Sequence, residues 1–143
     1  MHTTSRVVLL VVQAIVAVTA FAGGVALTAG SLNPDVAMVI RPPLEYLEGS
    51  PFSSYLVPGL VLALVLGGIH LLAFGSLLRR SPAALFWSTA AGYAALIWIF
   101  VQMVFIPFSF LQAIYFAAGA IELGLVLLIL GLLRGPRTSA PVA

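Results

Sequence analysis

The sequence contains no cysteine and no lysine, and only four acidic residues accompany its six arginines. Without cysteine the chain forms no disulfide, uses no thiol nucleophile and holds no Cys-ligated metal. A glycine-rich phosphate loop, a nucleophile elbow, a zinc-ligand spacing and a Ser-His-Asp order are also missing. We therefore predict no catalytic residue, no metal and no cofactor, since a hydrolase needs more acids and bases than this chain has.

Hydrophobic side chains are abundant instead. They make up 62% of the 143 residues, and charged residues make up only 7%, against about 25% charged residues in an ordinary soluble domain. A soluble particle of this size cannot hide so much apolar surface, because more than half of a small protein's surface stays wet. The composition argues against a soluble enzyme, a nucleic-acid binder and a disordered tail, and it predicts a lipid bilayer as the surrounding medium.

Four segments are long and apolar enough to cross that bilayer, which takes roughly 20 residues of helix. Since lipid offers no partner to backbone N–H and C=O groups, each segment must be helical. We predict one transmembrane domain over residues 1–143, an all-α integral membrane four-helix bundle. Its spans are 7–29, 55–78, 83–106 and 108–133, with an outer loop at 30–54.

The arginines predict the direction of threading. Arg6, the Arg79-Arg80 turn, Arg134 and Arg137 fall on one side of an even-numbered bundle, and only Arg41 falls on the other. By the positive-inside rule both termini face the cytoplasm. We expect a multi-pass protein of the bacterial inner membrane.

A second interpretation of the first span stays open. Arg6, the apolar run that follows it and the small residues Ala20-Phe21-Ala22 resemble a secretory signal with a cleavage site after residue 22. Against cleavage, the apolar run continues past Ala22 and reaches spanning length. Cleavage would leave three spans.

The outer loop is too long to lack structure of its own. Asn33-Pro34-Asp35 predicts a helix start, Pro42-Pro43 ends that helix, and Ser50-Pro51 predicts another cap and first turn. Pro58 predicts a kink or restart at the outer end of the second span. We expect an amphipathic cap on the outer leaflet, either a plain connector or a lid over a cavity.

Small residues on each span predict close helix packing or contact with another subunit. Gly24 on the first span, Gly59 on the second and Gly119 on the fourth stand among other small residues at helical spacing. The fourth span also carries a second row of small residues, Ala117, Gly124 and Gly131. We expect these faces to serve a protein partner or a homo-oligomer.

Two titratable side chains lie deep in the predicted bilayer. Glu122 is twelve residues before Arg134 and His70 is nine before Arg79, which places them about 18 Å and about 13.5 Å from the inner boundary. A lone carboxylate there costs several kcal/mol, so we predict that Glu122 and His70 share a proton or a hydrogen bond. The pair is either a proton or ligand site or a buried strut that fixes helix register. Gln102 and Gln112, level near the outer surface, form a second candidate pair.

Two local resemblances add to this. The stretch from Glu48 through Gly59 to Gly67-Gly68 resembles uncharacterised small four-helix membrane proteins of high-GC bacteria, which brings no activity with it. The stretch from Ala118 through Glu122 to Arg134 is similar to a helix of the DoxX-like membrane family, also four-helical. In that family the helix comes earlier in the chain, and the resemblance implies an association with redox partners.

Three functions follow as hypotheses. The first is an interaction or accessory subunit of a membrane assembly with no chemistry of its own. The second is a small proton-coupled transporter or carrier that uses Glu122 and His70. The third, a membrane enzyme acting on a lipid or quinone, has the least support in the residues.

Overall fold

The computed structural model describes residues 3–133, so Arg134 and Arg137 lie outside the described residues. Every regular element in that range is helical, and four helices are long and apolar enough to cross a membrane. The first, α1 (Thr3–Leu32), begins four residues earlier and ends three residues later than the predicted span. The chain is therefore all-α and suited to multiple membrane crossings.

The second long helix is built from three consecutive segments. These are α3 (Leu56–Val61), the π-helical segment η2 (Leu62–Gly67) and α4 (Gly68–Leu78). Pro58 falls in the first turn of α3, where its missing N–H costs no hydrogen bond, and the helix does not restart there. The irregularity predicted at Pro58 lies instead at η2, a widened turn that carries no proline.

The last two long helices are α5 (Ala84–Phe105) and α6 (Phe110–Ile129). Ser109 and Gln112 form a reciprocal capping box at the start of α6, in which each side chain accepts a hydrogen bond from the other residue's backbone N–H. The α6 helix ends at Ile129, followed by Gly131 with φ +77°. The predicted span to residue 133 was therefore four residues too long as a helix.

The connection between α1 and α3 contains two short helices. Asn33 caps α2 (Pro34–Ile40) by accepting the N–H groups of Asp35 and Val36, as the sequence predicts. A single turn, η1 (Leu44–Leu47), follows. The predicted helix start at Ser50-Pro51 was wrong: the Ser50 hydroxyl binds the Leu47 carbonyl and the Phe52 N–H, which closes a turn, and the next helix begins at Leu56.

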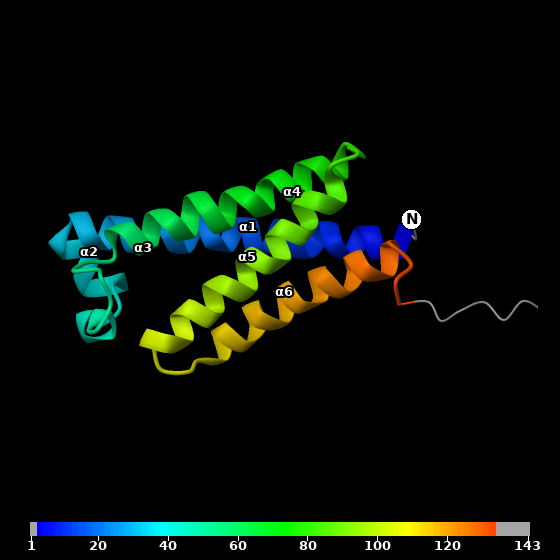
Figure 1. The fold of residues 1–143 in the computed structure, drawn as a ribbon. Helices are drawn as coiled ribbons and strands as arrows, with labels where there is room; N and C mark the ends of the chain where they lie inside the picture. The colour runs from blue at the N-terminus through cyan, green and yellow to red at the C-terminus, as the bar shows by residue number, and fades with distance from the viewer. Residues whose placement is uncertain (1–2, 134–143) are drawn as a thin grey trace, which may run out of the picture.

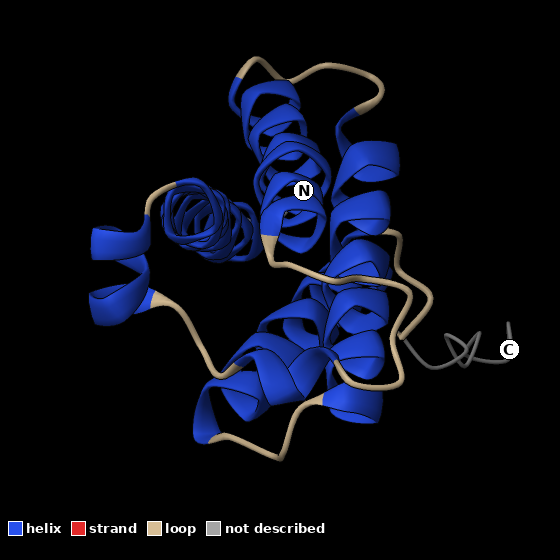
Figure 2. Ribbon diagram, turned by 90° about the vertical axis from the view of Figure 1, so that its left-hand side faces the viewer, coloured by secondary structure: helices blue, strands red, loops and turns tan. Residues whose placement is uncertain are grey.

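The long helices form two pairs, as Figure 1 shows. The α1 helix runs beside the α3–η2–α4 rod, and α5 runs beside α6 at an incline to the first pair. Figure 2, turned by 90° from Figure 1, shows helices joined by loops and no strand in the part of the chain that the structure describes. The α4 and η2 segments pack against α5, whereas α3 packs mainly against α1. The pairs therefore diverge toward the end of the molecule that carries α2 and η1.

Glycines allow the helices of each pair to touch through their backbones. A Cβ at Gly24 of α1 would lie 2.5 Å from the Gly59 carbonyl oxygen of α3. In the other pair, a Cβ at Gly119 of α6 would lie 3.0 Å from the Gly92 carbonyl oxygen of α5. Any larger residue at these positions would force the helices apart, so the predicted small faces on Gly24, Gly59 and Gly119 are packing faces inside this chain.

The outside of the four long helices is apolar. At most 33% of the residues in the most apolar stretch of any of them are buried, and the exposed side chains include many Val, Leu, Ile and Phe residues. Among residues 3–133, the interior holds five buried polar or ionisable side chains: Gln13, His70, Ser88, Gln112 and Glu122. A lipid surrounding favours this arrangement, in which polar side chains lie inside the helix assembly and apolar side chains lie on its outside.

Candidate functional site

His70 and Glu122 meet in the interior, where both side chains are fully buried. His70 comes from α4 and Glu122 from α6, and each of these helices packs against α1 and α5. The contact therefore crosses the middle of the helix assembly. The His70 Nε2 atom lies 3.3 Å from Glu122 Oε2. The structure therefore brings together the two residues that the sequence analysis placed at similar depths in the bilayer.

A backbone contact indicates which ring nitrogen of His70 carries a hydrogen. His70 Nδ1 is 2.8 Å from the carbonyl oxygen of Leu66, one turn earlier. A carbonyl oxygen only accepts, so Nδ1 carries a hydrogen and Nε2 faces Glu122. We expect one further proton on the pair, since a lone carboxylate in this interior is costly. It sits either on Glu122, which donates to a neutral imidazole, or on Nε2 of an imidazolium beside a carboxylate. In both arrangements the net charge of the pair is zero.

The pair remains imperfectly satisfied. Both carboxyl oxygens of Glu122 and Nε2 of His70 lack a hydrogen bond of good geometry within the described residues, although Nε2 and Oε2 are in contact. A buried polar group without a partner costs about 1–3 kcal/mol in a protein interior. A small movement of α4 against α6 would therefore improve or break the contact.

A second buried polar contact joins α1 to α5. Gln13 donates from Nε2 to Ser88 Oγ at 2.9 Å, and the Ser88 hydroxyl donates to the Ala84 carbonyl at 2.8 Å. The sequence analysis did not pair these two residues. Depth would have found the pair, since Gln13 is seven residues after Arg6 and Ser88 is eight after Arg80.

Arg6 connects α1 to the end of α4. Its guanidinium donates to the carbonyl oxygens of Leu77 and Leu78 at 3.0 and 3.1 Å. These carbonyls belong to the last turn of α4, and that of Leu77 also accepts the backbone N–H of Arg80 at 3.2 Å. The start of α1 is therefore fastened to the turn that carries Arg79 and Arg80.

The two amides Gln102 and Gln112 have separate surroundings. Gln112 is buried in the capping box with Ser109. Gln102, three residues before the end of α5, lines a cavity, and its side chain makes no hydrogen bond within the described residues. The structure contains no hydrogen bond between the two amides in that range.

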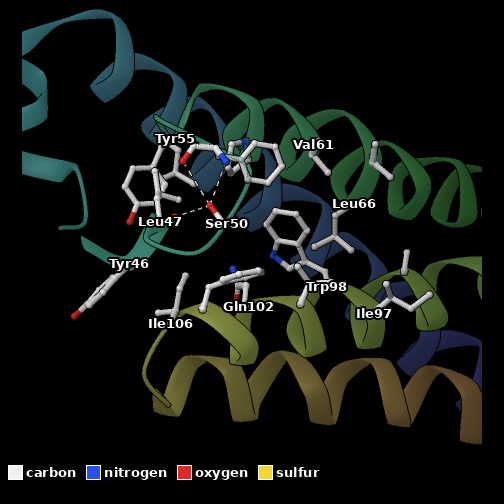
Figure 3. Close-up of a pocket in the computed structure, with 17 residues that line it drawn as sticks. Tyr46, Leu47, Ser50, Tyr55, Val61, Leu66, Ile97, Trp98, Gln102 and Ile106 are labelled. Carbon is white, nitrogen blue, oxygen red and sulfur yellow. Dashed lines mark hydrogen bonds between the residues drawn. The ribbon is translucent and has the colours of Figure 1, made fainter. Parts of the chain in front are cut away.

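The cavity has a volume of about 500 Å³ and lies where the helix pairs diverge. Figure 3 shows it between the rod of α3 and η2 on one side and α5 on the other, with the segment from Tyr46 to Tyr55 across its end. Burial, and then the nearby Tyr46, raise the pKa of Tyr55 above its ordinary value of 10.0. The Tyr55 hydroxyl thus stays protonated and donates to the Pro43 carbonyl at 2.7 Å.

The lining of the cavity is almost wholly apolar, and it includes neither His70 nor Glu122. The cavity and the buried pair are therefore distinct features. Leu66 takes part in both, because it lines the cavity and its carbonyl contacts His70. The connecting segment contributes Tyr46, Leu47 and Phe52 to the lining, which is the position a lid would occupy.

Comparisons with protein-family models, with curated proteins and with solved structures found no match for this chain.

Proposed function

We propose that this chain is an accessory subunit of a larger assembly in the bacterial inner membrane. In this proposal the four long helices form an N-in/C-in bundle, and the Arg79-Arg80 turn faces the cytoplasm. The segment with α2 and η1 lies on the outer leaflet. The excess of arginine on one side supports this orientation. So does the fold, because the start of α1, the α4–α5 turn and the end of α6 lie at one end of the molecule (Figure 1).

The observation that carries the accessory role is an open row of small residues on α6. Gly119 faces α5 closely, but a Cβ at Gly124 would meet nothing within 4 Å. Ala117 and Ala120, seven and four residues before Gly124, are exposed. Small residues permit close approach of helices in lipid. Lipid tails are as apolar as large side chains, so the burial of large apolar side chains does not drive helices together there. This row therefore fits a helix of another subunit or of a second copy.

The buried pair fits this role as a strut. His70 and Glu122 bridge α4 and α6 across the interior, and the cavity lining does not reach them. A net neutral pair held between two helices fixes their register, because any slip of one helix leaves both groups unpaired. The resemblance of residues 118–134 to the DoxX-like helix supports a redox protein as the class of partner.

The test compares Gly124→Leu with Gly75→Leu. A Cβ at either glycine would meet nothing within 4 Å, and the two residues lie on different helices, α6 and α4. Each variant should keep the thermal stability of the isolated chain. We expect Gly124→Leu to lose the partner or second copy that co-purifies in mild detergent, and Gly75→Leu to retain it. Equal assembly by both variants would contradict the proposal.

A proton-coupled carrier is the second candidate, and the buried contact between His70 and Glu122 favours it. A site with one proton between two groups and unsatisfied oxygens can load and release that proton when the helices move. Liposomes loaded with a pH-sensitive dye would show proton movement that Glu122→Gln abolishes. Proton movement that is absent from the wild-type protein, or unchanged in Glu122→Gln, would remove this candidate.

A further inference from the structure

The cavity between η2 and α5 opens sideways. Val65, Ile97 and Val101 line it, and they are at the same time 48%, 61% and 44% exposed. These residues belong to helices that span the apolar layer. A molecule therefore enters the cavity laterally from the surrounding lipid, without crossing water.

The size and lining of the cavity suit the apolar part of a ligand. Its volume of about 500 Å³ falls within the roughly 300–1,000 Å³ of small-molecule sites. Val61, Leu66 and Ile97 form the walls around Trp98 (Figure 3). An apolar chain that fills this space brings dispersion contacts that an empty cavity lacks.

Two donors at the cavity have no hydrogen-bond partner within the described residues. Trp98 and Gln102 stand four residues apart on α5 and so lie on one face. In Figure 3 the indole nitrogen of Trp98 is on the ring edge toward Gln102. Neither side chain makes a hydrogen bond within residues 3–133, whereas the hydroxyls of Ser50 and Tyr55 are satisfied by backbone groups. Half-buried tryptophan N–H groups normally find an acceptor.

We infer that the cavity binds one acyl chain of a membrane glycerolipid, with the ester carbonyl accepting hydrogen bonds from Gln102 and Trp98. The depth agrees with this ligand. Gln102 is three residues before the end of α5, about 4.5 Å along the helix axis, which is where the apolar layer meets the headgroups. Tyr46, Phe52 and Tyr55 surround the same end, as aromatic side chains do at that interface. A glycerolipid presents its chain, ester and headgroup in the same order.

The binding site goes beyond the proposed accessory role and does not depend on it. The lipid occupies the wedge between the helix pairs, so it holds them at the observed separation. The segment from Tyr46 to Phe52 covers its glycerol end.

Tryptophan fluorescence offers a direct test. The chain has two tryptophans, so Trp87→Phe leaves Trp98 as the sole reporter. A phosphatidylglycerol with brominated acyl chains, titrated into the detergent-solubilised full chain, should quench Trp98 saturably. In the same background Val61→Phe fills the cavity and should abolish the saturable quenching. Val57→Phe, on the same helix outside the lining, should retain it. Equal quenching in the two variants would overturn the site.

The carbonyl is tested without altering the cavity walls. A dialkyl ether lipid with the same brominated chains lacks the ester carbonyl and should bind about 25-fold more weakly than the diacyl lipid, about fivefold for each of the two hydrogen bonds. Gln102→Met should reduce that difference. Equal affinity for the two lipids would overturn the role of the carbonyl. Displacement of the bound lipid by an equimolar prenylquinone would overturn the assignment to a glycerolipid.

Discussion

Removal of one partner of the His70–Glu122 pair should cost far more stability than removal of both. His70→Leu leaves the Glu122 carboxyl buried beside α4 with no group to meet, since neither of its oxygens has another partner within the described residues. An unpaired buried group of this kind costs about 1–3 kcal/mol. Hydrogen bonds between membrane helices average about 0.6 kcal/mol and reach about 1.7 kcal/mol in double-mutant cycles. Because this contact is fully buried and central, we expect a coupling energy near 1.5 kcal/mol.

The conservative variant provides the contrast. Glu122→Gln keeps the shape of the side chain, and its amide can donate to His70 Nε2 while Nδ1 stays bound to Leu66. We therefore expect Glu122→Gln to stay within about 1 kcal/mol of the wild type. The double variant His70→Leu/Glu122→Leu should recover most of the stability that His70→Leu loses, because both polar groups then leave the interior together.

The assay is reversible unfolding of the purified chain in mixed micelles, followed by circular dichroism, for the wild type, both single leucine variants and the double variant. Additive effects of the two leucine substitutions would refute the coupling between His70 and Glu122. A loss in Glu122→Gln as large as in Glu122→Leu would refute the neutral, one-proton description of the pair.

Three further predictions concern the packing and the helix ends. Gly24→Ala should destabilise the chain by about 1–3 kcal/mol, since the new Cβ would lie 2.5 Å from the Gly59 carbonyl oxygen. Gly68→Ala, which would meet nothing within 4 Å, should be neutral or slightly stabilising by the same unfolding measurement. Ser109→Ala should cost about 1 kcal/mol because it removes the N-terminal cap of α6; an unchanged midpoint would contradict the role of the cap. Mass spectrometry of the protein purified from its membrane should show an uncleaved N-terminus, because the side chains of Arg6 and Gln13 form hydrogen bonds with other helices. A mass that lacks residues 1–22 would contradict this prediction.

The helices that are determined by the length of an apolar run or by a local capping residue were predictable from the sequence. The four apolar runs became the four long helices, and Asn33 began α2 where its side chain predicts a helix start. His70 and Glu122 could be matched because the rise of a helix converts sequence distance from an arginine into depth. That reasoning uses only local geometry and the boundary of the lipid.

Features that depend on how helices lie against one another were not predictable. The π-helical segment Leu62–Gly67 contains no proline or polar residue from which it could be predicted. It lies opposite α1, where a Cβ at Gly67 would be 3.0 Å from the ring of Phe21. The cavity arises from the divergence of two helix pairs, which no single helix encodes. Gln112 was expected to pair with Gln102. Its side chain instead accepts the backbone N–H of Ser109 at the start of α6. This local backbone donor is closer to Gln112 than a side chain on another helix.

Single-cysteine labelling tests the membrane crossing and its direction most directly, since the chain has no cysteine of its own. Ser53→Cys lies in the exposed segment before α3, and Ser81→Cys lies in the turn between α4 and α5. In intact cells a membrane-impermeant maleimide should label Ser53→Cys, and it should label Ser81→Cys only after the membrane is opened. Labelling of Ser81→Cys in intact cells, with Ser53→Cys protected, would contradict the proposed topology.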